Sequence, residues 1–282
     1  MFNDLFSSRD GYEISFQFSR LLLEELENPE TALGKYVKQG KYYPHFLNKP
    51  AQRPIRQLYY ALRLQDAVEK ILSSTNKSLV LDVACGVGSA SILFGLLGAD
   101  VIGIDLKAPR LEVAQKRIEY YKQKTGKNLS VTFLNQNVFN YCPSEEIDMI
   151  HCQESISHIH PAEDFVLYSY NKIKNGGCLI ISDANSLNPV PLFRAIKERG
   201  FNPYSVAKDP ETDEEIGYAV ERYFTVWGIK RLLRKANFKM QNIRMSCFIP
   251  HNLSTIGNFN FWKNMEIQLS KIPILSSFGF SI

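Results

Sequence analysis

The feature that most constrains the fold is a pair of short apolar segments, each followed by residues suited to a turn. Residues 79–88 read LVLDVACGVG, and residues 101–106 read VIGIDL. Runs of Leu, Val and Ile are typical of strands buried on both faces, as in a parallel sheet. Gly86 and Gly88 permit a sharp turn into a helix and leave room for a ligand that a Cβ would obstruct. Asp105, nineteen residues after Gly86, stands where an acidic side chain binds ribose hydroxyls in such folds. The pair therefore predicts a nucleoside-cofactor site.

The spacing of the small residues separates two classes of cofactor. A dinucleotide site needs G-x-G-x-x-G, since the pyrophosphate rests on a helix N-terminus, and Ser91 occupies the third position here. Residues 82–88, DVACGVG, instead resemble the D-x-A/G-x-G-x-G signature of class I S-adenosylmethionine (SAM)-dependent methyltransferases. In that family the glycines pack under a methionine-like tail without phosphate, so a third glycine is dispensable. The resemblance implies SAM as the cofactor and S-adenosylhomocysteine as its product.

The rest of the chain alternates expected strands and helices. Further strands are predicted at 129–134, 147–152, 178–183 and 238–248, with a last antiparallel strand at 278–282. Helices are predicted at 109–124, 161–175 and 226–236, the second ending before the Asn175-Gly176-Gly177 turn. Strands separated by helices imply right-handed βαβ units, with the ligand at the carboxyl ends of the strands. We therefore expect an α/β, Rossmann-like fold with a seven-stranded, mostly parallel sheet and helices on both faces.

The chain divides into four expected segments. They are an N-terminal helical lid or cap at 1–75, a SAM-binding core at 76–183, a substrate-side insertion at 184–224, and the C-terminal part of the core sheet with a helical and apolar tail at 225–282. The first segment shows helical periodicity at 12–27 and 54–73. A helical lid ahead of the first strand is usual in the resembled family. A loop as long as the insertion is more often functional than idle.

Two interpretations are open for residues 259–282. Large apolar residues flanked by lysines would suit a peripheral contact with a membrane surface. The alternative, which the architecture favours, is a helix that packs on the core and is followed by the last strand.

Composition narrows the class of protein. Of the 282 residues 45% are hydrophobic and 22% charged, which is ordinary for a soluble globular protein. The formal net charge of +4 gives no case for nucleic acid as a partner. Five widely spaced cysteines without a CxxC pair indicate reduced thiols rather than disulfides or zinc. The N-terminus does not read as a secretion signal, and no stretch approaches the roughly 20 apolar residues that span a bilayer. We expect a cytoplasmic protein.

The resemblance assigns cofactor contacts to the ends of four strands. The residues are Asp82, Ala84, Cys85, Gly86 and Gly88 after the first strand, Asp105 and Leu106 after the second, Asn137, Val138 and Phe139 after the third, and Gln153 and Glu154 after the fourth. Asp82 is expected to order the glycine loop and the cofactor amino group, and Asp105 to bind the ribose. The family often carries an acidic residue where Asn137 stands. Asn137 either accepts the adenine amino group in its place or only forms a turn.

Residues 151–161, HCQESISHIHP, hold three of the five histidines. They resemble a Glu-x-x-Glu-His motif that holds a divalent ion in ubiquinone-pathway O-methyltransferases, matching it at Glu154 and His158 but not at Ser157. With one ligand missing we expect no metal, because a hard cation takes several oxygen ligands. His158 is the candidate general base, since an imidazole suits proton removal at neutral pH. His151 lies within a strand and is expected to be structural.

The resemblance implies in-line transfer of a methyl group from SAM to an oxygen or nitrogen, and less readily a carbon, of a small-molecule or lipid-like acceptor. Aromatic residues that could line the acceptor pocket are Tyr42, Tyr43, Tyr218, Tyr223 and Trp227, which packing would explain as well. Two other classes stay open. One is a NAD(P)-dependent oxidoreductase of similar topology, and the other is a non-catalytic partner subunit that retains the fold.

Overall fold

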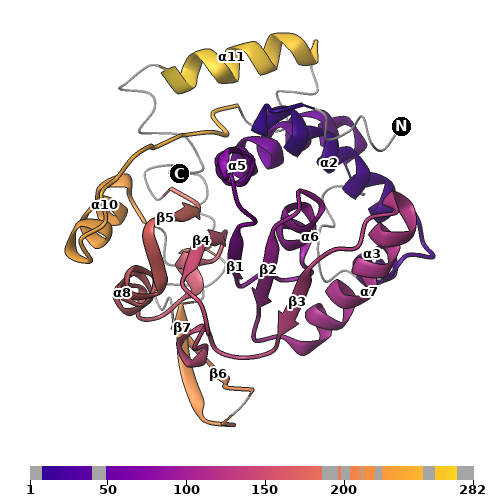
Figure 1. Cartoon of the computed structure of the whole chain (residues 1–282). Helices are drawn as coiled ribbons and strands as arrows, with labels where there is room; N and C mark the ends of the chain where they lie inside the picture. Colours follow the sequence, from indigo (N-terminus) through magenta and orange to yellow (C-terminus); the bar gives the residue numbers. More distant parts are fainter. Residues whose placement is uncertain are drawn as a thin grey trace.

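The computed structural model describes residues 8–39, 49–185, 196–197, 204–210, 212–219, 224–249 and 258–271. Within them the chain forms a parallel sheet of five strands in the order β3-β2-β1-β4-β5, with helices on both faces (Figure 1). The strands are β1 (Leu79–Val83), β2 (Asp100–Ile104), β3 (Val131–Leu134), β4 (Ile147–Gln153) and β5 (Ile173–Ser182). This confirms the predicted α/β, Rossmann-like class with a mostly parallel sheet.

Two hydrophobic clusters cover the two faces of the sheet. One face packs against α2 (Gly11–Glu27), α3 (Ala32–Lys38), α5 (Arg53–Ser73), α6 (Ser89–Leu96) and α7 (Ala108–Thr125). The other packs against α8 (Ala162–Lys172) and α10 (Val226–Lys235). Successive strand residues point to opposite faces, so Val80 belongs to the first cluster and Leu81 to the second. Short 3-10 helices occur at η1 (Pro50–Gln52), η2 (Val138–Asn140) and η3 (Ile156–His158).

The N-terminal helices α2 and α5 are built into the core. Their start and end match the predicted ranges 12–27 and 54–73 to within a residue. Phe18 on α2 is fully buried and shares a cluster with Val80 of β1 and Leu93 of α6. This segment therefore completes one layer of the fold, and its movement as a lid stays a prediction.

The predicted helix 161–175 is too long at its C-terminal end. Helix α8 ends at Lys172, and the expected turn at 175–177 lies inside β5, where the register against β4 shifts. Gly177 approaches β4 so closely that a Cβ would lie 2.8 Å from the carbonyl oxygen of Asp148. Gly177 thus serves close strand packing rather than a helix stop.

The predicted strand at 238–248 is wrong. The described residues there carry no strand, although they follow α10 as expected. Cys247 has a left-handed φ of 65°, which interrupts an extended ladder. The predicted strand at 278–282 lies outside the described residues, so a sheet of seven strands is not confirmed.

The insertion 184–224 contains a β-hairpin that the sequence did not reveal. Strands β6 (Tyr204–Lys208) and β7 (Glu215–Ala219) pair antiparallel with each other. The hairpin extends from the sheet at the lower edge of the molecule in Figure 1. Strand β7 contacts η3, which follows β4.

Helix α11 (Phe259–Lys271) lies along α5, at the top of Figure 1. Its Glu266 is 1% exposed and accepts hydrogen bonds from the Tyr59 hydroxyl and from the backbone N–H groups of Phe248 and Ile249. The packed-helix interpretation is confirmed for this part of the tail. None of the helices among the described residues is both long and apolar enough to cross a bilayer.

Candidate functional site

The loop after β1 turns through three left-handed residues. Ala84, Gly86 and Gly88 have φ values of 54°, 57° and 74°. Left-handed backbone is unstrained for glycine, whereas at Ala84 it costs on the order of 1–2 kcal/mol. A Cβ on Gly88 would lie 2.5 Å from Cζ of Phe133 on β3. The missing side chain of Gly88 therefore makes room for Phe133, and the contact of Gly88 with a ligand stays a prediction.

Asp105 follows β2 and binds the glycine loop directly. Its Oδ2 accepts the N–H of Gly86 at 2.9 Å, and its Oδ1 accepts the N–H of Lys107 at 2.8 Å. The residue is 6% exposed. A carboxylate offers about four acceptor positions, so the protein's two bonds leave capacity for hydroxyl donors. The sequence motif and the carboxylate thus form one hydrogen-bonded unit.

Asp82 lies deeper than expected. It is 3% exposed, and its oxygens bind Nδ1 of His151 at 2.8 Å and the Ser91 hydroxyl at 2.5 Å. Ser91, at the position of the missing third glycine, thus ties α6 to β1. His151 is fully buried, in line with a structural role, and packs edge-on against Phe94. Through its bond with Ser91, Asp82 orders the start of α6.

A cavity of about 500 Å³ opens at the carboxyl ends of β1, β2 and β3. Eight of the residues predicted for cofactor, catalysis or acceptor line it: Ala84, Asp105, Leu106, Asn137, Val138, Phe139, His158 and Tyr218. Tyr218 comes from the hairpin, whose segment 215–218 forms one wall. In open parallel sheets ligands bind at this edge, and the volume falls in the range of about 300–1,000 Å³ usual for ligand pockets.

Asn137 shows the turn that was one of its two expected roles. Its Oδ1 accepts the N–H of Phe139 at 3.1 Å and caps η2. The side chain also borders the cavity. An amide oxygen has two lone pairs, so the turn does not exclude a second donor.

The end of β4 adjoins this cavity but is held by other contacts. Val83 pairs with Cys152, which places Gln153 and Glu154 beside Ala84. Glu154 is left-handed, with a φ of 50°, and forms an ion pair with Arg63 of α5. Burial by itself lowers the pKa of Arg63, but the adjacent Glu154 carboxylate raises it above the usual value. Neither Gln153 nor Glu154 is among the residues that line the cavity.

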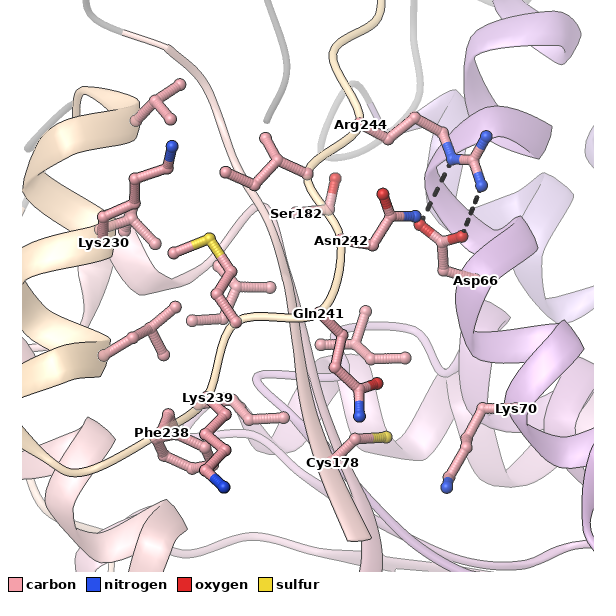
Figure 2. A pocket seen from close by; sticks show the side chains of 18 of the residues that line it. Asp66, Lys70, Cys178, Ser182, Lys230, Phe238, Lys239, Gln241, Asn242 and Arg244 are labelled. Carbon is pink, nitrogen blue, oxygen red and sulfur yellow. Dashed lines mark hydrogen bonds and ion pairs between the residues drawn. The ribbon is translucent and has the colours of Figure 1, made fainter. Parts of the chain in front are cut away.

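A second cavity, of about 380 Å³, lies beside β5, the edge strand of the sheet among the described residues (Figure 2). It is lined by β5, α5, α10 and the segment 238–246, and two of its lining residues, Arg244 and Asp66, form an ion pair at 2.9 Å. Its lining mixes apolar side chains with polar and charged ones, among them Lys70, Lys230 and Lys239. This cavity contains none of the residues predicted for cofactor, catalysis or acceptor, and it runs along the flank of the sheet rather than over the strand ends.

The sequence profile of the methyltransferase domain matches residues 55–243. The chain belongs to the methyltransferase-domain family. The ubiquinone biosynthesis O-methyltransferase of Glaesserella parasuis is 31% identical over 246 residues, which cover 85% of this chain and 90% of that protein. The enzyme of the same name from Rickettsia prowazekii is 30% identical over 162 residues, covering 56% of this chain and 62% of the relative. Across four rickettsial relatives this chain spans between 59% and 62% of their length.

Among solved structures, a SAM-dependent methyltransferase from Mesorhizobium loti aligns with a TM-score of 0.48 and 12% identity. The alignment covers 77% of this chain and 94% of that one.

The turn after β4 differs from the metal-binding motif of the resembled methyltransferases. Ser157 is 3% exposed, and its N–H donates to Oδ2 of Asp183 at 2.9 Å. Glu154 is engaged with Arg63. Over the described ranges, no three His, Cys, Asp or Glu side chains are grouped as a metal site would need.

Several predicted site residues do not line the 500 Å³ cavity. Asp82, Cys85, Gly86 and Gly88 support the loop without lining it. Trp227 is 62% exposed at the first turn of α10 and lines neither the 500 Å³ nor the 380 Å³ cavity, so its acceptor role stays a prediction. Tyr42, Tyr43 and Tyr223 lie outside the described residues.

Sequence reasoning missed Arg63, Asp183 and the hairpin wall. Asp183 directly follows β5, the position that marked Asp105 after β2, so the same signal could have found it. Burial raises the pKa of the Asp183 carboxyl, although the backbone N–H groups of Ser157 and Ala184 counter this. Arg63 is a charged residue in an amphipathic helix. The only signal that places it toward the core is its spacing of four residues from the buried Tyr59 and Ala67.

Proposed function

We propose that this methyltransferase-family protein moves the methyl group of SAM to a hydroxyl oxygen of an aromatic, lipid-like small molecule. The observation that carries the proposal is the Asp105 carboxylate, which borders the 500 Å³ cavity and is fixed by the N–H of Gly86. Its remaining acceptor capacity suits the two hydroxyls of a ribose. Apolar walls from Leu106, Val138 and Phe139 suit the adenine ring.

The proposed residues divide the work between binding and proton transfer. Bound SAM supplies a methyl group that its sulfonium already activates. The chain then has to orient the acceptor oxygen, and orientation alone lowers such barriers by about 7–11 kcal/mol. His158 is proposed to take the hydroxyl proton as the oxygen attacks, since it borders the cavity and is accessible. Tyr218 is proposed to contact the acceptor ring.

The choice of acceptor rests on the relatives rather than on the cavity. Both named relatives are ubiquinone biosynthesis O-methyltransferases, which favours oxygen over nitrogen and a ring with a hydrophobic substituent. We also propose a cytoplasmic location, with a peripheral contact to membranes through 259–282, where Phe261 is 59% exposed. Sedimentation with anionic vesicles tests that contact, and no binding of the full chain would exclude it.

Titration calorimetry with S-adenosylhomocysteine, NADH and NADPH tests the cofactor. Binding of S-adenosylhomocysteine alone supports the proposal, binding of a nicotinamide nucleotide favours the oxidoreductase, and binding of none favours a non-catalytic subunit. Labelled SAM with a prenylated catechol and a matched aniline then tests the acceptor. Label in the aniline alone would overturn the O-methyl assignment.

A further inference from the structure

A fully buried ion pair joins two helices behind the glycine loop. Arg117 on α7 and Glu25 on α2 each have 0% exposed side chains. The guanidinium donates from Nε to Oε1 and from Nη2 to Oε2, both at 2.8 Å. Such a two-pronged pair fixes the plane of the guanidinium as well as its position.

The same guanidinium reaches the glycine loop. Its Nη1 donates to the Val87 carbonyl oxygen at 2.5 Å and to the Ser89 hydroxyl at 2.9 Å. Val87 stands between Gly86 and Gly88, the two left-handed glycines of the loop. Glycine on both sides gives the loop unusual freedom, so a bond to the carbonyl between them removes more freedom than it would in a stiff segment.

Arg117 and Asp105 bind adjacent residues of the loop. Asp105 binds the N–H of Gly86, and Arg117 binds the carbonyl of the next residue, Val87. The relative position of loop and carboxylate is the geometry on which the proposed cofactor site depends. A shift of the guanidinium would therefore be transmitted to Gly86 and to its bond with Asp105.

Stability alone is a weak reason for this pair. Replacing a buried ion pair by apolar residues of similar volume is often neutral or stabilising, because both charges lose their hydration on burial. The contacts with the loop give the pair another use. We propose that Arg117 is a positioning residue for the cofactor, and that Glu25 sets its orientation. Cofactor affinity then depends on α2, an inference that rests on the proposed function.

The chain offers a matched control on the same two helices. Lys124 of α7 and Glu24 of α2 form an ion pair at 2.6 Å, with side chains 23% and 60% exposed. Lys124 lies two helical turns beyond Arg117 and donates to Glu24 and to the Tyr120 hydroxyl. Loss of this pair removes one α2–α7 contact without touching the loop.

The test compares Glu25→Gln, the double variant Glu25→Met/Arg117→Met and the control Glu24→Gln. The double variant removes both buried charges together, so it is expected to fold even where the single variant does not. We expect the Kd of S-adenosylhomocysteine and the KM of SAM to rise about tenfold in the Glu25 variants, within the usual range for coupling between sites. Turnover at saturating SAM and both constants of Glu24→Gln should stay near wild type. A folded double variant with wild-type Kd would overturn the proposal.

A second measurement separates this inference from the proposed function. If wild-type protein binds no S-adenosylhomocysteine, the proposed function fails, but the tether can still be tested in the free protein. Hydrogen exchange of the amides at 86–89 should be faster in the double variant than in wild type or Glu24→Gln, because local opening becomes easier. Equal exchange in all three would overturn the inference.

Discussion

The loops at the carboxyl ends of β1–β3 and the segment beside β5 are held by different kinds of contact. At the carboxyl ends, each loop is joined to the next by a hydrogen bond between a side chain and a backbone group. Examples are the bonds from the Gly86 N–H to the Asp105 carboxylate and from the Asn135 side chain to the Asp105 carbonyl. Beside β5, the segment 238–246 is joined to α5 by the partly exposed ion pair of Arg244 and Asp66 and lines a cavity. A bond to a backbone group fixes the path of the chain at that residue. An ion pair between two side chains fixes the chain only where packing holds both side chains in place.

The largest expected effect is on stability, from Gly88→Ala. The new Cβ would lie 2.5 Å from the Phe133 ring, in left-handed backbone. Strain and overpacking together should lower the free energy of unfolding by about 3 kcal/mol, measured by urea denaturation. Gly98→Ala is the control, since Gly98 has a φ of 94° but no atom within 4 Å of the added Cβ. Equal losses would show that the Phe133 contact is unimportant.

The next effect is catalytic. His158→Ala should lower kcat about 100-fold, the scale of general-base catalysis, while the Kd of S-adenosylhomocysteine stays within about twofold of wild type because cofactor contacts are kept. Unchanged kcat would remove His158 as the base.

A smaller effect is expected on cofactor binding. Asp105→Ala should weaken binding of S-adenosylhomocysteine by about 1–3 kcal/mol, the scale for hydrogen bonds to a charged group. The control is Asp100→Ala, at the opposite end of β2, where the carboxylate meets Lys77 at the surface. Calorimetry on both variants decides the point, and similar losses at the two ends of the strand would contradict the assigned role.

The smallest effect lies on the α5–α11 side and depends on pH. Burial raises the pKa of Glu266, although backbone N–H donors from 247–249 counter this. A carboxyl whose folded pKa is raised stabilises the fold below its usual pKa of about 4.3, and loses that contribution as pH rises through the raised value. The unfolding free energy of wild type minus that of Glu266→Gln should therefore fall between acidic and neutral pH. A flat or rising difference would contradict the direction of the shift.

The fold was most predictable where local signals carry the geometry. The glycines, Asp105 and the buried strands located β1 to β4. Eight residues predicted for the site line one cavity, and their roles stay predictions. The contact between Gly88 and Phe133 was not predicted, because Phe133 lies on a strand 45 residues later in the chain.

The failures share a physical cause. The strand expected at 238–248 has suitable residues, but its pairing depends on β5 and on the conformation of Cys247, neither of which is local. The hairpin at 204–219 was hidden because its outer face is polar or exposed, as Val206 at 61% shows. Arg117 stands at helical spacing from Ala114 and Tyr121, so periodicity could have placed it in the core had charge not suggested solvent.

The hairpin of β6 and β7 separates two evolutionary tasks. Among the described residues its strands pair only with each other, yet Tyr218 borders the same cavity as Asp105. Such a hairpin can be exchanged, lengthened or altered in sequence while the parallel sheet and its glycine loop stay intact. Selection for a new acceptor could therefore act on one wall of the cavity and leave the other unchanged.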